Sequence, residues 1–438
     1  MAGGIIKWFP VMKKLLLLLS FSFCLLSFAK AQTDTLTVMQ YNLLNYNNYT
    51  SYCTAANNNV SNKDAYLKTI VDYVLPDIFT VCEMNQLQTS VDRVLTNVMN
   101  TSGRSNYAKG PRTNYSSSDM VNMVYYNTNK LVYHSYTAYP TDIRDINVYT
   151  FYYKDPAIAV TNDTAWITCI IMHLKAGSYE ADAAERLAEV TILMNQLNAL
   201  NKPGNYLAMG DFNTYTSTEE CYDLLLNHTN PNIRFYDPIT KPGDWNNNCS
   251  FASYHTQSTH NDYNNDCFAA GGLDDRFDHI MASLDVMSGG KNVKYISGSY
   301  TALGNDGNHC NDSINQGTNT SVPANVLAAL MGNSDHLPVI LKLQIDVATG
   351  INDEVKVPFD FYIPSNSADD NGILVSHCNG EFSIEVMNVT GSLVYRFQTN
   401  AATGYNTINL SDIPKTASIA FFRITDPDGN VKVYRTLR

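Results

Sequence analysis

A series of short apolar runs that alternate with a few amphipathic helices, between Thr35 and about Asp346, most constrains the fold of this chain. Residues 36–41 alternate as in a half-buried strand, whereas 78–82 is a nearly continuous apolar run typical of a buried strand. Similar runs predict strands at 120–126, 166–172, 206–209, 278–283 and 337–343. Apolar residues at helical spacing predict helices over 63–75 and 180–200. This alternation of strands and helices indicates an α/β fold.

Polar residues that suit metal or phosphate chemistry stand at one end of several of these runs. They are Asn42, Glu83, His173, Asp211 with Asn213, Asp278, and Asp335 with His336. Strands whose ends meet at one edge of a sheet bring such side chains into one cleft. Carboxylate and amide oxygens suit Mg²⁺, Mn²⁺ or Ca²⁺, and histidines transfer protons near neutral pH. The pattern therefore predicts a hard-metal site with acid–base groups beside it, and no Cys/His spacing suggests zinc.

Each of these residues taken alone has an ordinary structural explanation. An Asn or Glu after a strand is usually a turn or surface residue. Asp211 could cap the turn that follows it, and His336 could be a hydrogen-bonded histidine of the core. The functional interpretation depends on all the sites occurring together in one order.

Several segments together resemble the endonuclease/exonuclease/phosphatase superfamily, which includes deoxyribonucleases, abasic-site endonucleases, inositol-phosphate phosphatases and bacterial sphingomyelinases. The most specific are 210–213 (Gly-Asp-Phe-Asn) and 334–339 (Ser-Asp-His-Leu-Pro-Val). The others are 38–42, 76–83, 172–174 and 276–280. The resemblance spans residues 38–339 and implies a four-layered α/β sandwich, in which helices flank two packed mixed sheets.

The resemblance also implies metal-dependent hydrolysis of a phosphate ester by direct in-line attack of water. Glu83 would be the main metal ligand, with Asn42 and Asp335 beside it or around a second ion. The cofactor would be Mg²⁺, with Mn²⁺ or Ca²⁺ as alternatives. Phosphoryl transfer needs much charge neutralisation, which a divalent ion supplies.

The remaining residues would carry the catalytic roles. By the same resemblance, Asp211 would orient or deprotonate the attacking water, and Asn213 would hold that water or bind a phosphate oxygen of the substrate. His336, paired with Asp278, would bind the scissile phosphate and stabilise its developing charge or act as a base. His173 would assist the leaving oxygen as a general acid, with Asp119 or Asp145 as a guess for its orienting carboxylate.

The net charge limits how such a protein could meet a polyanion. After the first 31 residues the chain has 25 basic residues against 41 acidic ones, a net charge of −16. This excess excludes a basic nucleic-acid binder that acts through its overall field. It does not exclude nucleic acid as a substrate, because a bound metal can supply positive charge locally.

Residues 1–31 have the pattern of a secretory signal peptide. Lys13 and Lys14 precede an apolar stretch over 15–28, and Ala-Lys-Ala at 29–31 fits a cleavage site. The alternative is a membrane anchor, but about 14 apolar residues are fewer than the roughly 20 that a spanning helix needs. Either Met1 or Met12 could be the start. We therefore expect export, without stable membrane insertion.

An exported chain permits disulfides, and eight cysteines follow the signal. Cys221, Cys249 and Cys267 lie in polar, loop-like sequence, which favours some pairing among them. Cys82 and Cys169 lie in apolar runs, where a buried free thiol is at least as plausible as a disulfide.

Residues 352–438 follow the predicted catalytic domain at 32–347 and consist of short β runs separated by glycines. They predict a small antiparallel β-sandwich. Residues 386–394, 408–411 and 429–438 resemble the C-terminal sorting domain of type IX secretion, which would make the secretion machinery a partner and place the protein outside the cell or on its surface. The alternative is a sandwich that binds carbohydrate or a surface.

The sequence favours a secreted, monomeric nuclease acting on DNA or RNA. Polar loops at 44–62, 100–119, 243–275 and 298–325, rich in Asn, Ser and Tyr, could bind sugar and phosphate and stack on bases. A phosphomonoesterase or a sphingomyelinase-like lipid phosphodiesterase is the alternative, although the loops lack an apolar hairpin for a membrane. A non-catalytic adhesin on the same fold would be expected to have lost a central residue.

Overall fold

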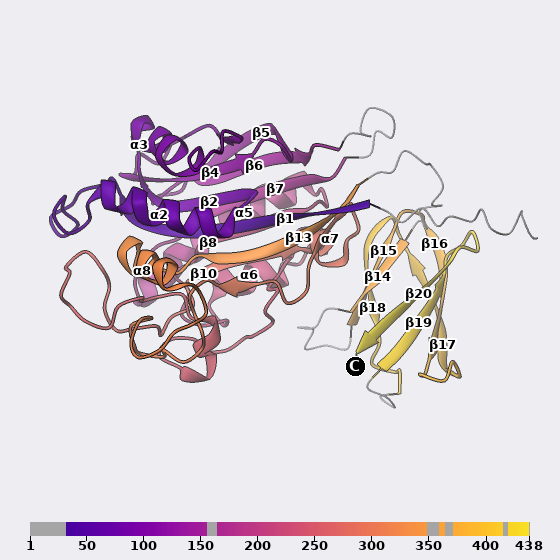
Figure 1. Cartoon of the computed structure of the whole chain (residues 1–438). Coiled ribbons are helices and arrows are strands. Elements are labelled where there is room, and N and C mark those ends of the chain that lie inside the picture. The colour runs from indigo at the N-terminus through magenta and orange to yellow at the C-terminus, as the bar shows by residue number, and fades with distance from the viewer. Residues whose placement is uncertain (1–31, 156–163, 348–358, 364–370, 415–418, 438) are drawn as a thin grey trace, which may run out of the picture.

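The computed structural model describes residues 32–155, 164–347, 359–363, 371–414 and 419–437 (Figure 1). The predicted signal peptide at 1–31, with both candidate start residues, lies outside the described residues. Among the described residues, no helix is both long enough and apolar enough to cross a membrane.

Two mixed sheets form the centre of the larger part of the molecule. The strands of the first are β1 (Gln32–Tyr46), β2 (Ile78–Asn85), β3 (Tyr107–Lys109), β4 (Met120–Asn127), β11 (Val293–Tyr295), β12 (Thr301–Ala302) and β13 (Val339–Val347). Its order is β11-β13-β1-β2-β4-β3, with β12 also paired to β13. Of its pairs, β1–β2 is parallel. The remaining pairs of this sheet are antiparallel.

The second sheet is built on the same plan. Its strands are β5 (Leu131–Tyr139), β6 (Ile146–Tyr153), β7 (Trp166–His173), β8 (Tyr206–Asp211), β9 (Phe235–Tyr236) and β10 (Asp278–Ser283). Their order is β5-β6-β7-β8-β10-β9, and β7–β8 is parallel. Each sheet therefore has one parallel pair near its middle.

Helices cover the outer face of each sheet. They are α2 (Val60–Val74), α3 (Gln88–Val94), α5 (Glu180–Leu200), α6 (Glu220–Asn227) and α8 (Ala324–Asn333), with short helical turns at η1 (Leu95–Met99), η2 (Pro231–Ile233) and η3 (Cys249–Tyr254). The short helix α7 (Leu284–Ser288) instead follows β10 and packs against β11, with Val286 in the cluster between the sheets. Strand alternation divides the core: in β1, Val38 packs between the two sheets, whereas Tyr41 packs under α2 and α8. A third cluster packs α5 and α6 on the second sheet. The layers run helix, sheet, sheet, helix, which confirms the predicted four-layered sandwich.

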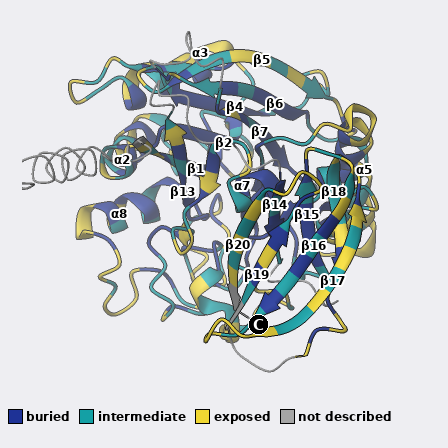
Figure 2. Ribbon diagram, turned by 90° about the vertical axis from the view of Figure 1, so that its right-hand side faces the viewer, coloured by how far each residue is buried: buried dark blue, intermediate teal, exposed yellow. Residues whose placement is uncertain are grey.

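The described residues between 359 and 437 form two antiparallel sheets of their own. One contains β14 (Phe359–Tyr362), β15 (Asn371–Ser376) and β18 (Gly404–Asn409). The other contains β16 (Gly380–Met387), β17 (Leu393–Ala401), β19 (Ile419–Thr425) and β20 (Val431–Leu437), in the order β17-β16-β19-β20. Apolar side chains including Phe361, Phe382 and Phe422 fill the space between them, as expected of a small sandwich. Figure 2, which views these sheets from outside, shows exposed residues along β17.

The predicted strands and both predicted helices occur, with small shifts of their ends. The predicted strand at 337–343 begins only at Val339, because Leu337 donates its N–H to the Thr256 carbonyl of a neighbouring loop instead. The loops predicted at 44–62, 100–119, 243–275 and 298–325 are largely irregular, but they contain β3, η3 and β12.

The predicted cysteine pairing is wrong in its partners. Cys53 bonds to Cys267 and Cys249 bonds to Cys310, so Cys249 and Cys267 are not joined to each other. Cys221 is a free, buried thiol, because it lies on the inner face of α6 rather than in a loop. Cys82 and Cys169 are free and buried, as predicted.

Candidate active site

The parallel pairs of the two sheets end at the same edge of the sandwich. In β1–β2, Asn42 stands opposite Cys82, one residue before Glu83, and in β7–β8, His173 stands opposite Asp211. A hydrogen bond of 2.9 Å from Asn42 Nδ2 to Asp211 Oδ2 joins the two sheets at this edge. Side chains from four strands are thereby brought together, as predicted from the strand ends.

The backbone is irregular where these side chains leave the strands. Glu83 has φ +57° and lies at a bulge of β2, and Asn213 has φ +51°. Gly210 has φ +147°, and a Cβ built there would lie 1.7 Å from the Met172 carbonyl oxygen. Residues held in such sparsely populated conformations are concentrated at functional sites. Here they turn side chains out of the sheets and into one space.

Asn42 lies at the centre of the cluster. Its Nδ2 is 3.0 Å from Glu83 Oε1, 2.9 Å from Asp211 Oδ2 and 3.4 Å from His336 Nε2. Its Oδ1 accepts the Leu44 N–H at 2.9 Å, which fixes the direction of the amide. In this arrangement the nitrogen of Asn42, rather than its oxygen, faces the carboxylates, so the side chain orients Glu83 and Asp211.

Glu83, His173 and Asp211 place one ligand atom each within 4.8 Å of one another. The Nε2 atom of His173 lies 3.7 Å from both Glu83 Oε1 and Asp211 Oδ2. Burial raises the pKa of Glu83, and the nearby Asp335 carboxylate raises it further. Burial also raises the pKa of Asp211 to about 6, in spite of the positive charge of His336. Two carboxylates are thus held together in a buried space that disfavours their charge.

His336 forms a buried pair with Asp278. Its Nδ1 donates to Asp278 Oδ2 at 2.7 Å, as predicted for these two residues. Although burial disfavours the imidazolium, Asp278 and Asp211 raise the pKa of His336 well above its ordinary value. The other ring nitrogen, Nε2, lies 3.7 Å from Asp211 Oδ2 and 2.8 Å from the Gln257 amide. The charged ring therefore points into the same space as Asp211.

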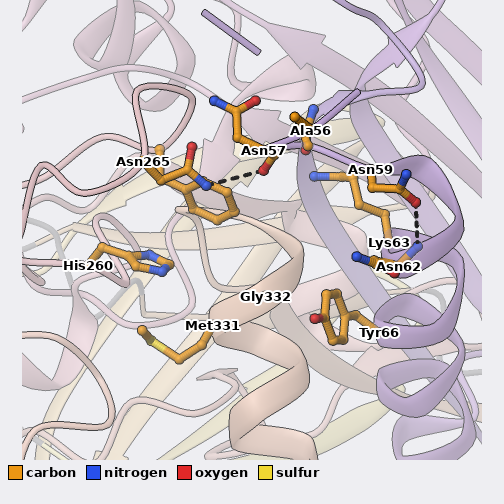
Figure 3. Close-up of a pocket in the computed structure, with 12 residues that line it drawn as sticks. Ala56, Asn57, Asn59, Asn62, Lys63, Tyr66, His260, Asn265, Met331 and Gly332 are labelled. Carbon is orange, nitrogen blue, oxygen red and sulfur yellow. Dashed lines mark hydrogen bonds between the residues drawn. The ribbon is translucent and has the colours of Figure 1, made fainter. Parts of the chain in front are cut away.

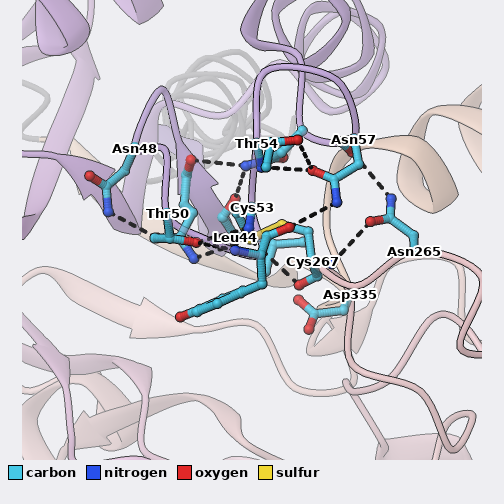
Figure 4. Close-up of a disulfide and its surroundings, with 12 residues drawn as sticks. Leu44, Asn48, Thr50, Cys53, Thr54, Asn57, Asn265, Cys267 and Asp335 are labelled. Carbon is cyan, nitrogen blue, oxygen red and sulfur yellow. Dashed lines mark hydrogen bonds between the residues drawn. A yellow bond between two sulfur atoms is a disulfide. The ribbon is translucent and has the colours of Figure 1, made fainter.

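Asp335 is close to the cluster but is held differently. Its Oδ2 accepts the Ala269 N–H at 3.0 Å, next to the disulfide that joins Cys53 to Cys267 (Figure 4). Its Oδ1 is buried and has no hydrogen-bond partner among the described residues. Asp335 is not one of the three residues whose ligand atoms lie within 4.8 Å, so it stands beside that group.

Asn213 is fixed against the strand ends. Its N–H donates to Asp211 Oδ1 at 3.0 Å and its Nδ2 donates to the Leu174 carbonyl at 3.1 Å. Through the first bond Asp211 caps the turn that follows it, so the two side chains are held together.

His173 lacks the carboxylate partner that was guessed from the sequence. The carboxylate of Asp145 instead accepts the N–H groups of Tyr115 and Ser116. Within the described part of the chain, Nδ1 of His173 has no hydrogen-bond partner. Burial, together with the charges of Arg144 and His336, lowers the pKa of His173 well below its ordinary value. The ring is therefore neutral near pH 7.

Gln257, Lys63 and Arg144 were missed as site residues. Gln257 belongs to an irregular loop, and its amide near His336 has no signal in the sequence. Lys63 Nζ donates to the Leu44 carbonyl at 3.1 Å and also to the carbonyl of Asn333. Arg144 Nη1 donates to the His173 carbonyl at 3.2 Å. Lys63 was missed because it begins the helix predicted over 63–75, and a lysine at such a position is usually a surface residue.

The donor set fits a divalent cation. Glu83, Asp211 and Asp335 are three acids near one another, and the hydrogen bonds of Lys63 and Arg144 go to main-chain carbonyls instead. Asp211 faces the His336 imidazolium, but Glu83 and Asp335 have no lysine or arginine partner in the part of the chain that the structure describes. Oxygen donors of this kind suit Mg²⁺, Mn²⁺ or Ca²⁺.

No protein-family model matches this sequence, and no curated protein matches it. Among solved structures, the catalytic domain of human Nocturnin with a bound sulfate anion is similar at 13% identity, over 71% of this chain and 97% of that one, with a TM-score of 0.43. An endonuclease/exonuclease/phosphatase family protein from Bacteroides thetaiotaomicron is similar at 15% identity, over 72% and 97%, with a TM-score of 0.43. D. rerio TDP2 complexed with a single-strand DNA product is similar at 11% identity, over 71% and 99%, with a TM-score of 0.43.

Proposed function

We propose that this chain is a hydrolase of phosphate esters that uses a divalent cation. The observation that carries the proposal is the buried group of carboxylates around Glu83 and Asp211, facing the imidazolium of the Asp278–His336 pair. A phosphate ester needs positive charge on its oxygens and a base for the attacking water, and this group offers both.

Glu83 would hold the cation, with Asp335 and Asp211 beside it and Asn42 orienting the carboxylates. When bound, the ion would supply positive charge to the phosphate oxygens. Among the ions that suit these ligands, Mg²⁺ is our first choice, with Mn²⁺ or Ca²⁺ as alternatives.

The chain's own residues would perform the proton and positioning steps. Asp211, whose pKa is about 6, is a carboxylate near neutral pH and would accept or orient a proton of the attacking water. Asn213 would hold that water or a phosphate oxygen. His336, kept charged by Asp278, would donate a hydrogen bond to the phosphate. The neutral ring of His173 would donate a hydrogen bond to the leaving oxygen.

We propose further that the substrate is a nucleic acid. Five exposed tyrosines lie in loops at the edge of the sandwich that carries the site: Tyr49, Tyr52, Tyr115, Tyr179 and Tyr263. Tyr179 and Tyr263 are 79% and 85% exposed, which is unusual for rings of this size. Exposed rings around a phosphate site suit stacking with unpaired bases. The net charge of −16 that the chain carries after residue 31 opposes a long polyanion, so short or single-stranded substrates fit best.

Export is part of the same proposal. The signal pattern at 1–31 and the resemblance of the C-terminal residues to a type IX sorting domain support a secreted enzyme. Expression of the full chain and of a chain ending at 351 in a bacterium with type IX secretion tests this. We expect the full chain in the medium or on the cell surface and the shorter chain inside the cell envelope.

The proposed activity is tested with methyl p-nitrophenyl phosphate, a short DNA strand and a short RNA strand. Each is incubated with Mg²⁺, Mn²⁺, Ca²⁺ or EDTA. We expect hydrolysis that EDTA abolishes, and a loss of at least about 10²-fold in kcat for Asp211→Ala. Asn195→Ala, on an exposed position of α5, is the control. Activity that survives EDTA, or an Asp211→Ala variant as active as the parent, would refute the mechanism.

A further inference from the structure

A cavity of about 210 Å³ lies beside the candidate active site, between α2, α8 and the loop before β10 (Figure 3). Asn62, Lys63 and Tyr66 line it from α2, and His260 and Asn265 line it from the loop. In Figure 3 the ring of His260 faces the α2 side across the cavity. This cavity has no role in the mechanism proposed above.

Two segments connect the cavity to the carboxylates. Asn58, in its wall, donates to the carbonyls of Leu44 and Asn45 at 3.2 and 3.1 Å, and the Asn45 N–H donates to Glu83 Oε2 at 3.0 Å. On the other wall, Phe268 precedes Ala269, whose N–H donates to Asp335. A group in the cavity is therefore a near neighbour of a phosphate held at Glu83 and Asp335.

One atom of the wall lacks a partner. Asn58 is 2% exposed, and its Oδ1 has no hydrogen-bond partner among the described residues. This oxygen is buried inside the wall, so a molecule in the cavity would contact other side chains of the lining, among them Asn62 and His260.

The lining selects a neutral ligand that both donates and accepts hydrogen bonds. Its side chains are mainly amides and rings, and the amine of Lys63 is engaged with the main chain through the Leu44 and Asn333 carbonyls, so the lining offers little to a second phosphate. A hydroxyl group both donates and accepts hydrogen bonds, and it can therefore bond with the Asn62 amide and the His260 ring. The rings of Tyr66 and Phe268 offer apolar surface to the carbons of a small ring. The cavity volume of about 210 Å³ is below the roughly 300–1,000 Å³ of pockets that bind larger ligands, so the cavity suits a single small ring.

We infer that this cavity binds a hydroxyl-bearing ring in the alcohol part of the phosphate ester, either the ribose of RNA or the ring of a sugar phosphate. The inference rests on the proposed function, since it places this ring next to the reacting phosphate. Within a strand, ribose keeps a free 2′-hydroxyl whereas deoxyribose has none, so the cavity predicts a preference for RNA over DNA.

Ligand-observed saturation-transfer NMR on the mature full-length chain tests binding without turnover. The probes are methyl β-D-ribofuranoside, methyl β-D-glucopyranoside and cyclopentanol. We expect a saturation-transfer signal from at least one glycoside and none from cyclopentanol. The glycoside signal should be severalfold weaker in Asn62→Ala and in His260→Ala than in the parent. Asn195→Ala is the matched control, because it removes an exposed helix amide far along the chain from the cavity. A stronger riboside signal identifies RNA as the source of the ring, and a stronger glucoside signal identifies a sugar phosphate.

Equal glycoside signals in Asn62→Ala, His260→Ala and Asn195→Ala, or no glycoside signal in the parent, overturn the inference. Hydrolysis of methyl p-nitrophenyl phosphate, which carries no ring hydroxyl, is measured separately and tests the proposed function alone.

A second readout is the KM for a ribodinucleotide, compared with the KM for a deoxyribodinucleotide. We expect the former to be about tenfold lower in the parent and the two to be nearly equal in Asn62→Ala. Equal KM values in the parent contradict the cavity's role in choosing the substrate.

Discussion

At the scale of single residues, one amide organises the charges of the site. Asn42 donates toward Glu83 from its own sheet and toward Asp211 from the other sheet, and the bond from the Leu44 N–H to Oδ1 keeps the amide from turning over. An aspartate at this position would add another carboxylate to acids that already have raised pKa values. Because Asn42 is neutral, it can donate hydrogen bonds to both Glu83 and Asp211 without adding a third negative charge between them.

The Asp278–His336 pair leads to a prediction about pH. Asp278 and Asp211 raise the pKa of His336 against the effect of burial, so the charged ring persists until the pH rises through that value. If the imidazolium binds the phosphate, kcat/KM falls on the alkaline side. Asp278→Asn removes one of the two charges, so this alkaline limb should move to lower pH and kcat should fall by about 10²-fold or more. The pH profile of methyl p-nitrophenyl phosphate hydrolysis measures both, and an unshifted limb would contradict the role of Asp278.

Gly210 is the residue at which the backbone leaves least room. Its φ of +147° and the Met172 carbonyl oxygen, 1.7 Å from a built Cβ, exclude any side chain. Gly210→Ala should therefore push β8 away from β7, lower the free energy of unfolding by about 3 kcal/mol or more, and displace Asp211. Urea unfolding followed by circular dichroism measures the loss. The control is Gly298→Ala, where φ is also positive but no atom lies within 4 Å of the added Cβ.

At the scale of elements, the long loops are held by bonds that join distant parts of the chain. Cys53–Cys267 spans 214 residues and connects the loop after β1 to the loop before β10. The second loop supplies the Ala269 N–H to Asp335 and the Gln257 amide to His336. The disulfide therefore anchors a loop that contacts both Asp335 and His336.

Removal of this disulfide should affect activity as well as stability. For the double variant Cys53→Ser/Cys267→Ser we expect a loss of about 3 kcal/mol in the free energy of unfolding, because the unfolded chain gains freedom, and a lower kcat because Asp335 and His336 lose support. The matched variant Cys249→Ser/Cys310→Ser opens a disulfide spanning 61 residues and should leave kcat nearer to that of the parent. Urea titration and initial rates measure the two effects. Equal kcat in both double variants would show that Cys53–Cys267 has no special role at the site.

The strands and loops also show how much of the fold and of the candidate site could be predicted from the sequence. Buried strands such as β2 and β8 were predicted because their apolar runs end in polar residues, and the same feature located Glu83 and Asp211. Strands β5 and β6 were missed, since their many tyrosines and threonines resemble loop sequence. Most of β5 is only partly buried, whereas most of β6 is buried. Gln257 and the cysteine partners were beyond prediction, because contacts between irregular loops depend on tertiary packing, which has no period in the sequence.

At the scale of the whole molecule, the candidate site residues and the C-terminal sheets occupy different parts. All the candidate site residues lie between 42 and 336, at an edge formed by strand ends of the two mixed sheets. The C-terminal sheets touch the larger part through a small apolar cluster of Tyr236, Leu284 and Ile373. Tyr236 also contacts Tyr362, with ring centroids 6.2 Å apart. The contact involves β9, α7 and η2, and none of these carries a site residue.

Deletion of the C-terminal sheets should therefore separate stability from catalysis. A chain of residues 32–350 exposes the cluster around Tyr236 and Leu284, and the loss of one small apolar contact should cost about 1–2 kcal/mol, or a few degrees in Tm. Its kcat for methyl p-nitrophenyl phosphate should stay within about twofold of the full chain, because the site's hydrogen bonds all lie within residues 42–336. Tyr362→Ala in the full chain, which removes only the ring contact with Tyr236, should lower Tm by less than the deletion does. A tenfold fall in kcat on deletion would mean that the C-terminal sheets support the site through α7 and β10, and the two parts would then have to be regarded as one catalytic unit.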